Sequence, residues 1–68
     1  MKNRVKQERI EKKMTQTELA DNLGVSRQTV FAIETAKYIP STILALKLAR
    51  IFKKPIEHFF ELEKNDIP

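Results

Sequence analysis

Apolar residues recur along this chain at helical spacing, and short polar or glycine-containing segments separate the groups. The sharpest signal is Thr15-Gln16-Thr17-Glu18, a capping box in which the Thr15 hydroxyl accepts from the Glu18 amide while the glutamate reaches back. Gly24 supplies the left-handed residue that ends this helix. The inward face between the two signals comprises Leu19, Ala20 and Leu23.

Two more helices flank this one. The first is expected from about Asn3, its cap, to Lys13, although its apolar positions are sparse. These positions are Val5, Ile10 and Met14. The other is expected from Arg27 to about Thr35, capped by Ser26, with Val30 and Ile33 facing inward.

The C-terminal part predicts two further helices. Pro40-Ser41 starts the fourth, whose apolar stripe comprises Leu44, Leu48, Ala49 and Ile51-Phe52. Pro55 opens a short fifth helix from Ile56 to about Phe60, and a polar, acidic tail (61–68) follows. The pattern therefore predicts an all-α, five-helix domain, with room for a short strand pairing between residues near Met1 and near Glu61.

Only Gly24-Val25-Ser26 separates the second helix from the third, a turn length that sets two helices roughly perpendicular. Residues 15–36 are thus expected to form a helix-turn-helix. The outward face of its second helix combines Arg, Gln and apolar groups, which can contact guanine, adenine and a thymine methyl group. The candidate base-reading residues are Arg27, Gln28, Phe31 and Ala32.

Length and charge narrow the possible functions. Sixty-eight residues fit one domain, and the chain has no cysteine and one histidine, His58, which argues against a metal site, a cofactor or catalysis. The last twelve residues carry four acids and one lysine, a net charge of −3. Residues 1–56 therefore have a net charge of +7, and the whole chain has +4. A basic body favours a polyanionic partner. Neither a membrane span nor a signal peptide is expected, which predicts a cytoplasmic protein.

The run Thr15-Gln16-x-Glu18-Leu19-Ala20-x-x-Leu23-Gly24-Val25-Ser26-Arg27-Gln28-Thr29-Val30 resembles the phage-repressor (Cro-like, XRE-type) helix-turn-helix family. The likeness continues through Ile33-Glu34, Lys37-Tyr38 and Pro40-Ser41 and covers about residues 4–62. It implies a transcriptional regulator that binds double-stranded DNA as a homodimer, reads a near-palindromic operator in the major groove, and acts as a repressor.

The resemblance also implies a role for several single residues. Gln16 matches a position that contacts a phosphate and braces a neighbouring base reader, and Thr29 and Lys37 are further phosphate or positioning candidates. Arg9 and Glu34 match a structural ion pair between the first and third helices. The last helix resembles the usual dimer contact, whose candidates are Ile56, Phe59, Phe60 and Leu62.

Departures from the family pattern predict local strain. Lys13, Ala36 and Lys53 stand where the family commonly has glycine, so three helix ends are either strained, at about 1 kcal/mol each, or closed by different turns. Glu8 replaces a common leucine, which Ile10 is expected to offset. Phe31 often corresponds to a smaller or polar residue, so a core or dimer role is its alternative.

Some alternatives stay open at this point. A helix-turn-helix can also serve as a protein-interaction module, for example in an antitoxin. His58 is expected at a helix surface or at the dimer contact. Lys12-Lys13 and Lys53-Lys54 are expected to be solvated helix ends, with a phosphate contact as the alternative. RNA binding lacks the aromatic sheet or Gly-rich loop of the usual modules.

Overall fold

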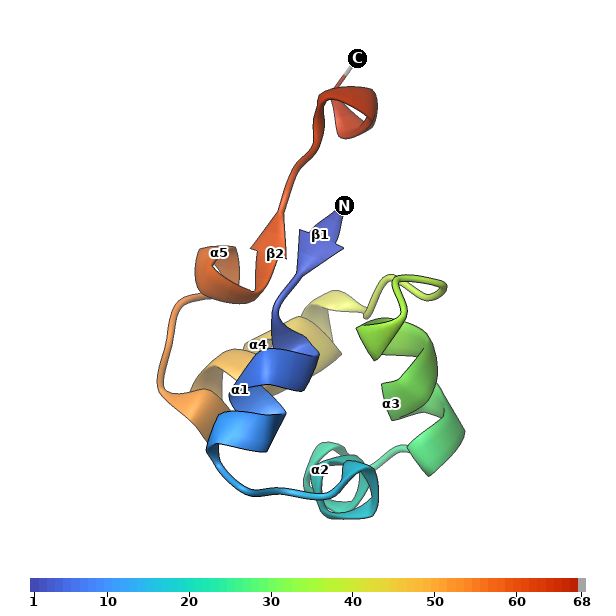
Figure 1. Cartoon of the computed structure of the whole chain (residues 1–68), viewed down its shortest axis with the longest axis vertical. Helices are drawn as coiled ribbons and strands as arrows, with labels where there is room; N and C mark the ends of the chain where they lie inside the picture. The colour runs from blue at the N-terminus through green and yellow to red at the C-terminus, as the bar shows by residue number, and fades with distance from the viewer. Residues whose placement is uncertain (68) are drawn as a thin grey trace.

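Two capped helices joined by a left-handed turn lie at one end of the molecule in the computed structural model, which describes residues 1–67 (Figure 1). Helix α2 (Gln16–Leu23) follows the predicted capping box, in which the Glu18 N–H donates to Thr15 Oγ1 at 3.0 Å and the Thr15 N–H to Glu18 Oε1 at 2.8 Å. Gly24 ends α2 at φ 75°. Helix α3 (Arg27–Glu34) begins after Ser26, whose side chain accepts from the Thr29 N–H.

The N-terminal helix α1 (Val5–Glu11) starts later and ends earlier than predicted. Asn3 is not its N-cap residue, because residues 2–3 form strand β1 (Lys2–Asn3), antiparallel to β2 (Phe60–Glu61), with Lys2 opposite Glu61. The side-chain amide of Asn3 instead donates its Nδ2 to the Ile33 carbonyl at 2.9 Å. The short strand pairing considered from the sequence is therefore present. It includes Asn3, so this residue belongs to a strand and not to the start of the first helix.

The C-terminal half closes over the first three helices. Helix α4 (Thr42–Phe52) is capped by Ser41, whose hydroxyl accepts from the Leu44 N–H at 3.2 Å. Helix α5 (Ile56–Phe59) ends one residue before the expected Phe60, which belongs to β2. Beyond β2 the chain leaves the body and forms a 3₁₀ turn, η1 (Lys64–Asp66), far from α2 (Figure 1).

The core contains apolar residues from all five helices, which confirms the all-α prediction for the described part of the chain. Phe59 lies at its centre with no exposed surface and packs on Phe52 at a ring-centroid distance of 5.5 Å. Ile10, expected to face inward, is 55% exposed. The buried apolar residues are Val5, Leu19, Ala20, Leu23, Val30, Ile33, Leu44, Leu48, Phe52 and Phe59.

Three non-glycine residues adopt the left-handed conformation after α1, α3 and α4. Lys13 has φ 57°, Ala36 φ 61° and Lys53 φ 55°. The Cβ of an L-residue crowds the following carbonyl oxygen in this region, which costs about 1–2 kcal/mol per residue. Of the two expectations, strained ends or different turns, the structure has the strained ends.

Candidate nucleic-acid interface

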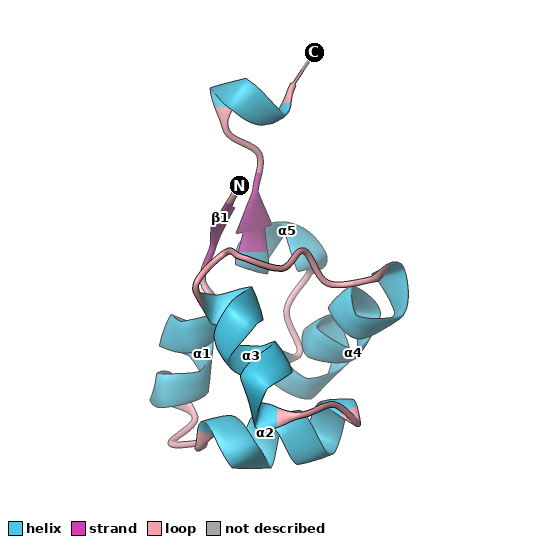
Figure 2. Ribbon diagram, turned by 90° about the vertical axis from the view of Figure 1, so that its right-hand side faces the viewer, coloured by secondary structure: helices cyan, strands magenta, loops and turns pink. Residues whose placement is uncertain are grey.

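Helix α3 has one face in the core and one in solvent. Val30 and Ile33 are buried, whereas Arg27 and Gln28 are exposed and Phe31 is 51% exposed. Ala32 is partly buried beside them. Figure 2 views the molecule with α3 in front and α2 running across its lower end. The alternative that Phe31 is a core residue is therefore wrong for this chain.

The turn before α3 is held from both sides. The Val25 N–H donates to the Ala20 carbonyl at 3.0 Å, and Val25 packs against the core. Lys47 of α4 donates its Nζ to the Leu23 carbonyl at 3.2 Å, at the end of α2. Lysine near a helix C-terminus satisfies an orphan carbonyl and complements the helix dipole. The sequence reasoning missed Lys47, which lies 24 residues from its partner.

A chain of polar contacts runs from α1 to the start of α3. Arg9 donates its Nε to Glu34 Oε2 at 2.6 Å and its Nη2 to Glu34 Oε1 at 3.3 Å, so the ion pair implied by the resemblance is present. Glu34 Oε1 also accepts from Gln16 Nε2 at 3.2 Å. Gln16 Oε1 accepts in turn from Arg27 Nη1 at 3.1 Å. Gln16 thus contacts the neighbouring Arg27 while its position at the start of α2 stays half-exposed.

A groove of about 590 Å³ runs beside α3, between this helix and the loop that leads to α4. Thr29 is half-buried in it, and its hydroxyl lies 3.0 Å from Ser26 Oγ, within the cap. Tyr38 forms the outer wall and is 43% exposed. Sequence reasoning did not name Tyr38 as a site residue, although it lies in the matching run. The lining residues are Val25, Ser26, Gln28, Thr29, Ala32, Tyr38 and Leu44.

Lys37 follows α3 on an exposed turn. The Ala36 N–H donates to the Ile33 carbonyl at 3.0 Å and the Lys37 N–H to the Ala32 carbonyl at 2.9 Å, the pattern of a left-handed helix end. This turn directs the exposed Lys37 away from the core, at the opposite end of α3 from Arg27.

The predicted dimer residues do not form one exposed surface. Phe59 is fully buried within the chain, so its assignment to a dimer contact is corrected to a core role. Ile56 and Phe60 are half-buried, and Leu62 is 63% exposed on the tail. Instead, Ile39 is 69% exposed and lines an apolar recess of about 270 Å³. Its lining residues are Met1, Ile39, Pro40, Thr42, Ala45, Ile56 and Phe60.

A buried carboxylate joins α1 to the α4–α5 region. Glu8 is 8% exposed and accepts from Lys54 Nζ at 2.8 Å, while its other oxygen lies 2.7 Å from His58 Nε2. The Lys54 ammonium, and then the His58 ring, hold the pKa of the Glu8 carboxyl below its usual value. Ion pairing therefore stabilises Glu8 at a buried position where the family commonly has leucine. Ile10 was expected to compensate for that missing leucine, but its side chain is exposed and does not do so. Lys54 is likewise not a simply solvated helix end.

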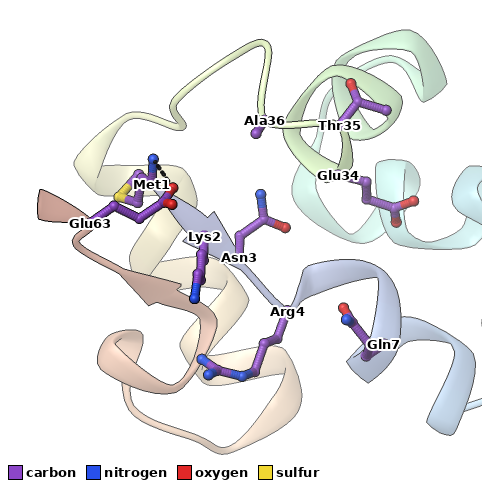
Figure 3. A pocket seen from close by; sticks show the side chains of 9 residues that line it. All are labelled: Met1, Lys2, Asn3, Arg4, Gln7, Glu34, Thr35, Ala36 and Glu63. Atoms are coloured by element: carbon purple, nitrogen blue, oxygen red, sulfur yellow. Dashed lines mark ion pairs between the residues drawn. The ribbon is translucent and has the colours of Figure 1, made fainter. Parts of the chain in front are cut away.

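An open recess of about 400 Å³ lies between β1, the start of α1 and the end of α3 (Figure 3). Two of its cationic groups already have partners: the Met1 ammonium lies 3.0 Å from Glu63 Oε1, and Arg4 Nη2 lies 3.0 Å from Glu61 Oε2. The hydrogen bonds that the Met1 ammonium donates to the Glu63 and Asp66 carboxylates raise its pKa. Within residues 1–67, no three acidic, histidine or cysteine side chains gather into a set able to hold a metal ion. Over the same residues, no helix is both long and apolar enough to span a membrane.

Comparison with known proteins agrees with this geometry. A helix-turn-helix family model matches residues 5–59, which include α1 to α5. An uncharacterized HTH-type transcriptional regulator of Methanocaldococcus jannaschii is 48% identical over 97% of this chain and all of its own length. Another such regulator, from Bacillus subtilis, is 44% identical over 97% of this chain and over its own full length. A third, from Archaeoglobus fulgidus, is 42% identical over 98% of this chain and 94% of its own length. The chain therefore belongs to the XRE-type helix-turn-helix family of the phage repressors.

Proposed function

We propose that this protein is a transcriptional regulator that binds double-stranded DNA with sequence specificity. The observation that carries the proposal is the exposed N-terminal end of α3, where Arg27 and Gln28 stand clear of the core. An arginine can donate two hydrogen bonds to guanine and a glutamine can pair with adenine in the major groove. The similar proteins named as HTH-type transcriptional regulators support the same function.

Charge placement supports one orientation on DNA. The acidic tail extends away from α2 and α3 (Figure 1), whereas the basic residues belong almost entirely to the body. With α3 in the major groove, Gln16 at the start of α2 and Lys37 after α3 lie on either side of the reading residues and are the candidate phosphate contacts. Phosphate contacts of this kind set the register and make the affinity depend on salt.

The proposed assembly is a twofold homodimer on a near-palindromic operator, with two copies of α3 about 34 Å apart. An interface around a twofold axis must be complementary to itself. The exposed Ile39 lines an apolar recess together with Ile56 and Phe60, so a projecting side chain and a recess occur on one surface. We therefore place the dimer contact on this surface, with Leu62 at its edge. Occlusion of a promoter, hence repression, is the proposed mode of action.

Selection from a randomised duplex library tests the function directly. The wild-type protein should enrich a near-palindromic site, and Arg27→Ala or Gln28→Ala should weaken binding to that site by about 1–3 kcal/mol while relaxing the base preference. Lys64→Ala removes an exposed lysine of the tail and is the matched control, with little expected change. Failure to enrich any duplex, with no salt-sensitive binding to DNA, would refute the proposal and favour a protein-interaction module.

A further inference from the structure

The Glu34 carboxylate has more partners than an ion pair to Arg9 requires. Its side chain is 2% exposed, and its oxygens accept from two Arg9 nitrogens and from Gln16 Nε2. Gln16 then contacts Arg27 through its other amide atom, the oxygen. We propose that Glu34 is a positioning residue for base recognition: through Gln16, it orients the Arg27 guanidinium toward DNA. This inference rests on the proposed function.

Hydrogen-bond chemistry allows only one orientation of the Gln16 amide between these neighbours. An ionised carboxylate can only accept, so Gln16 must turn its NH₂ group toward Glu34. The amide oxygen then faces Arg27, whose guanidinium can only donate. Each of the two contacts requires this same orientation, so together they hold the amide in it. The orientation of a flexible surface side chain is thus determined by a carboxylate buried behind it.

The contact leaves the reading edge of Arg27 available. Gln16 receives its hydrogen bond from Nη1, and within residues 1–67 neither Nε nor Nη2 of Arg27 has a hydrogen-bond partner. These two nitrogens form one edge of the planar guanidinium, and this edge matches the two acceptors, O6 and N7, that guanine presents in the major groove. Holding Nη1 therefore reduces the freedom that Arg27 would lose on binding, which favours the correct base.

Replacing the carboxylate by an amide should reverse the orientation of Gln16. In Glu34→Gln the new carbonyl oxygen is the only acceptor that the side chain at position 34 offers to Arg9, so the new NH₂ group faces Gln16. The Gln16 oxygen then turns toward that NH₂ group and away from Arg27. The shape of the side chain at position 34 is kept, so this change tests orientation with little change in packing.

The free protein provides a first measurement that does not depend on DNA. Nitrogen relaxation of the Arg27 Nε–Hε group should show a more mobile side chain in Glu34→Gln and in Gln16→Met than in the wild type. Glu57→Gln removes one exposed acid on α5 and is the charge-matched control, with no expected change. If Arg27 has the same mobility in all four proteins, the positioning role is wrong, whatever the protein binds.

The second measurement is a double-mutant cycle on base discrimination. The probe is the duplex that the wild type selects from a random library, together with the single-base variant against which Arg27→Ala loses discrimination. Glu34→Gln should lower this discrimination about three- to tenfold, the value of one hydrogen bond. In the Gln16→Met background the same change should have less than about a twofold effect, because the connecting amide is gone.

The cycle separates positioning from a purely structural role. If Glu34→Gln reduces discrimination equally with and without Gln16, the carboxylate acts by holding the fold, and the inference is overturned. Should Glu34→Gln unfold, Glu34→Asp retains the charge beside Arg9 but withdraws it from Gln16, and the same two outcomes apply. A wild type that selects no duplex refutes the proposed function, whereas the mobility measurement still decides whether Glu34 positions Arg27.

Discussion

Glycine at the left-handed helix ends should stabilise this protein, and Ala36 gives the cleanest test. Its φ of 61° costs an L-residue about 1–2 kcal/mol, and glycine removes that cost. Glycine also adds about 0.5–1 kcal/mol of chain entropy to the unfolded state, which opposes the gain. The expected net effect of Ala36→Gly is a stabilisation of about 0.5–1 kcal/mol.

The size of the chain makes this effect easy to measure. An unfolding entropy of about 2.1 cal/mol/K per residue gives roughly 140 cal/mol/K for 68 residues, so 1 kcal/mol corresponds to about 7 °C in Tm. Ala36→Gly should therefore raise Tm by about 3–7 °C. Lys13→Gly and Lys53→Gly lie at separate helix ends, so the three effects should add to about 2 kcal/mol, or roughly 14 °C.

Thermal unfolding followed by circular dichroism is the assay, and two variants serve as controls. Ala32→Gly is the same change within α3, where glycine costs about 1 kcal/mol, so Tm should fall by about 7 °C. Lys12→Gly removes the same charge as Lys13→Gly at a residue with φ −81°, and it should not stabilise. Equal losses of Tm in Ala36→Gly and Ala32→Gly would show that the turn after α3 carries no such strain.

Four further outcomes are expected. Hydrogen bonds lower the pKa of the Glu8 carboxyl in the folded protein. The ionised carboxylate therefore contributes about 1–2 kcal/mol to the free energy of unfolding above pH 4.5, the ordinary pKa, and this contribution is lost as the pH falls through the lowered pKa. Urea titrations should thus show Glu8→Gln less stable than the wild type at pH 7, with the difference disappearing in acid; a constant difference would contradict this. Lys37→Ala should weaken binding to all duplexes alike and lower the salt slope by about 1, whereas Arg27→Ala should alter base preference; a change of preference in Lys37→Ala would contradict its phosphate role. Ile39→Glu should shift sedimentation toward the monomer without loss of helix content, and an unchanged dimer would place the contact elsewhere. Phe59→Ala should lower the free energy of unfolding by about 3–5 kcal/mol, as expected for a core phenylalanine; a small loss would argue that its site is not packed in solution.

Much of this fold follows from signals between residues three or four positions apart. The Thr15–Glu18 capping box, the Ser26 and Ser41 caps and the left-handed Gly24 each depend on groups within one helical turn. The inward positions of α2 and α3 follow from helical periodicity. For this reason the bounds of these helices and the exposure of Arg27 and Gln28 could be predicted from the sequence.

Only the tertiary structure decided which distant groups meet. Glu8 lies 46 and 50 residues from Lys54 and His58, and nothing local to any of them indicates that they share a site. Asn3 left its predicted cap because strand pairing with Phe60 begins there, and Phe59 became the centre of the core rather than a dimer contact. The Gln16 amide likewise obtained its orientation from Glu34, 18 residues away. Local geometry specifies caps and periodicity, whereas burial and long-range ion pairs depend on how the packed helices meet, a property of the whole chain.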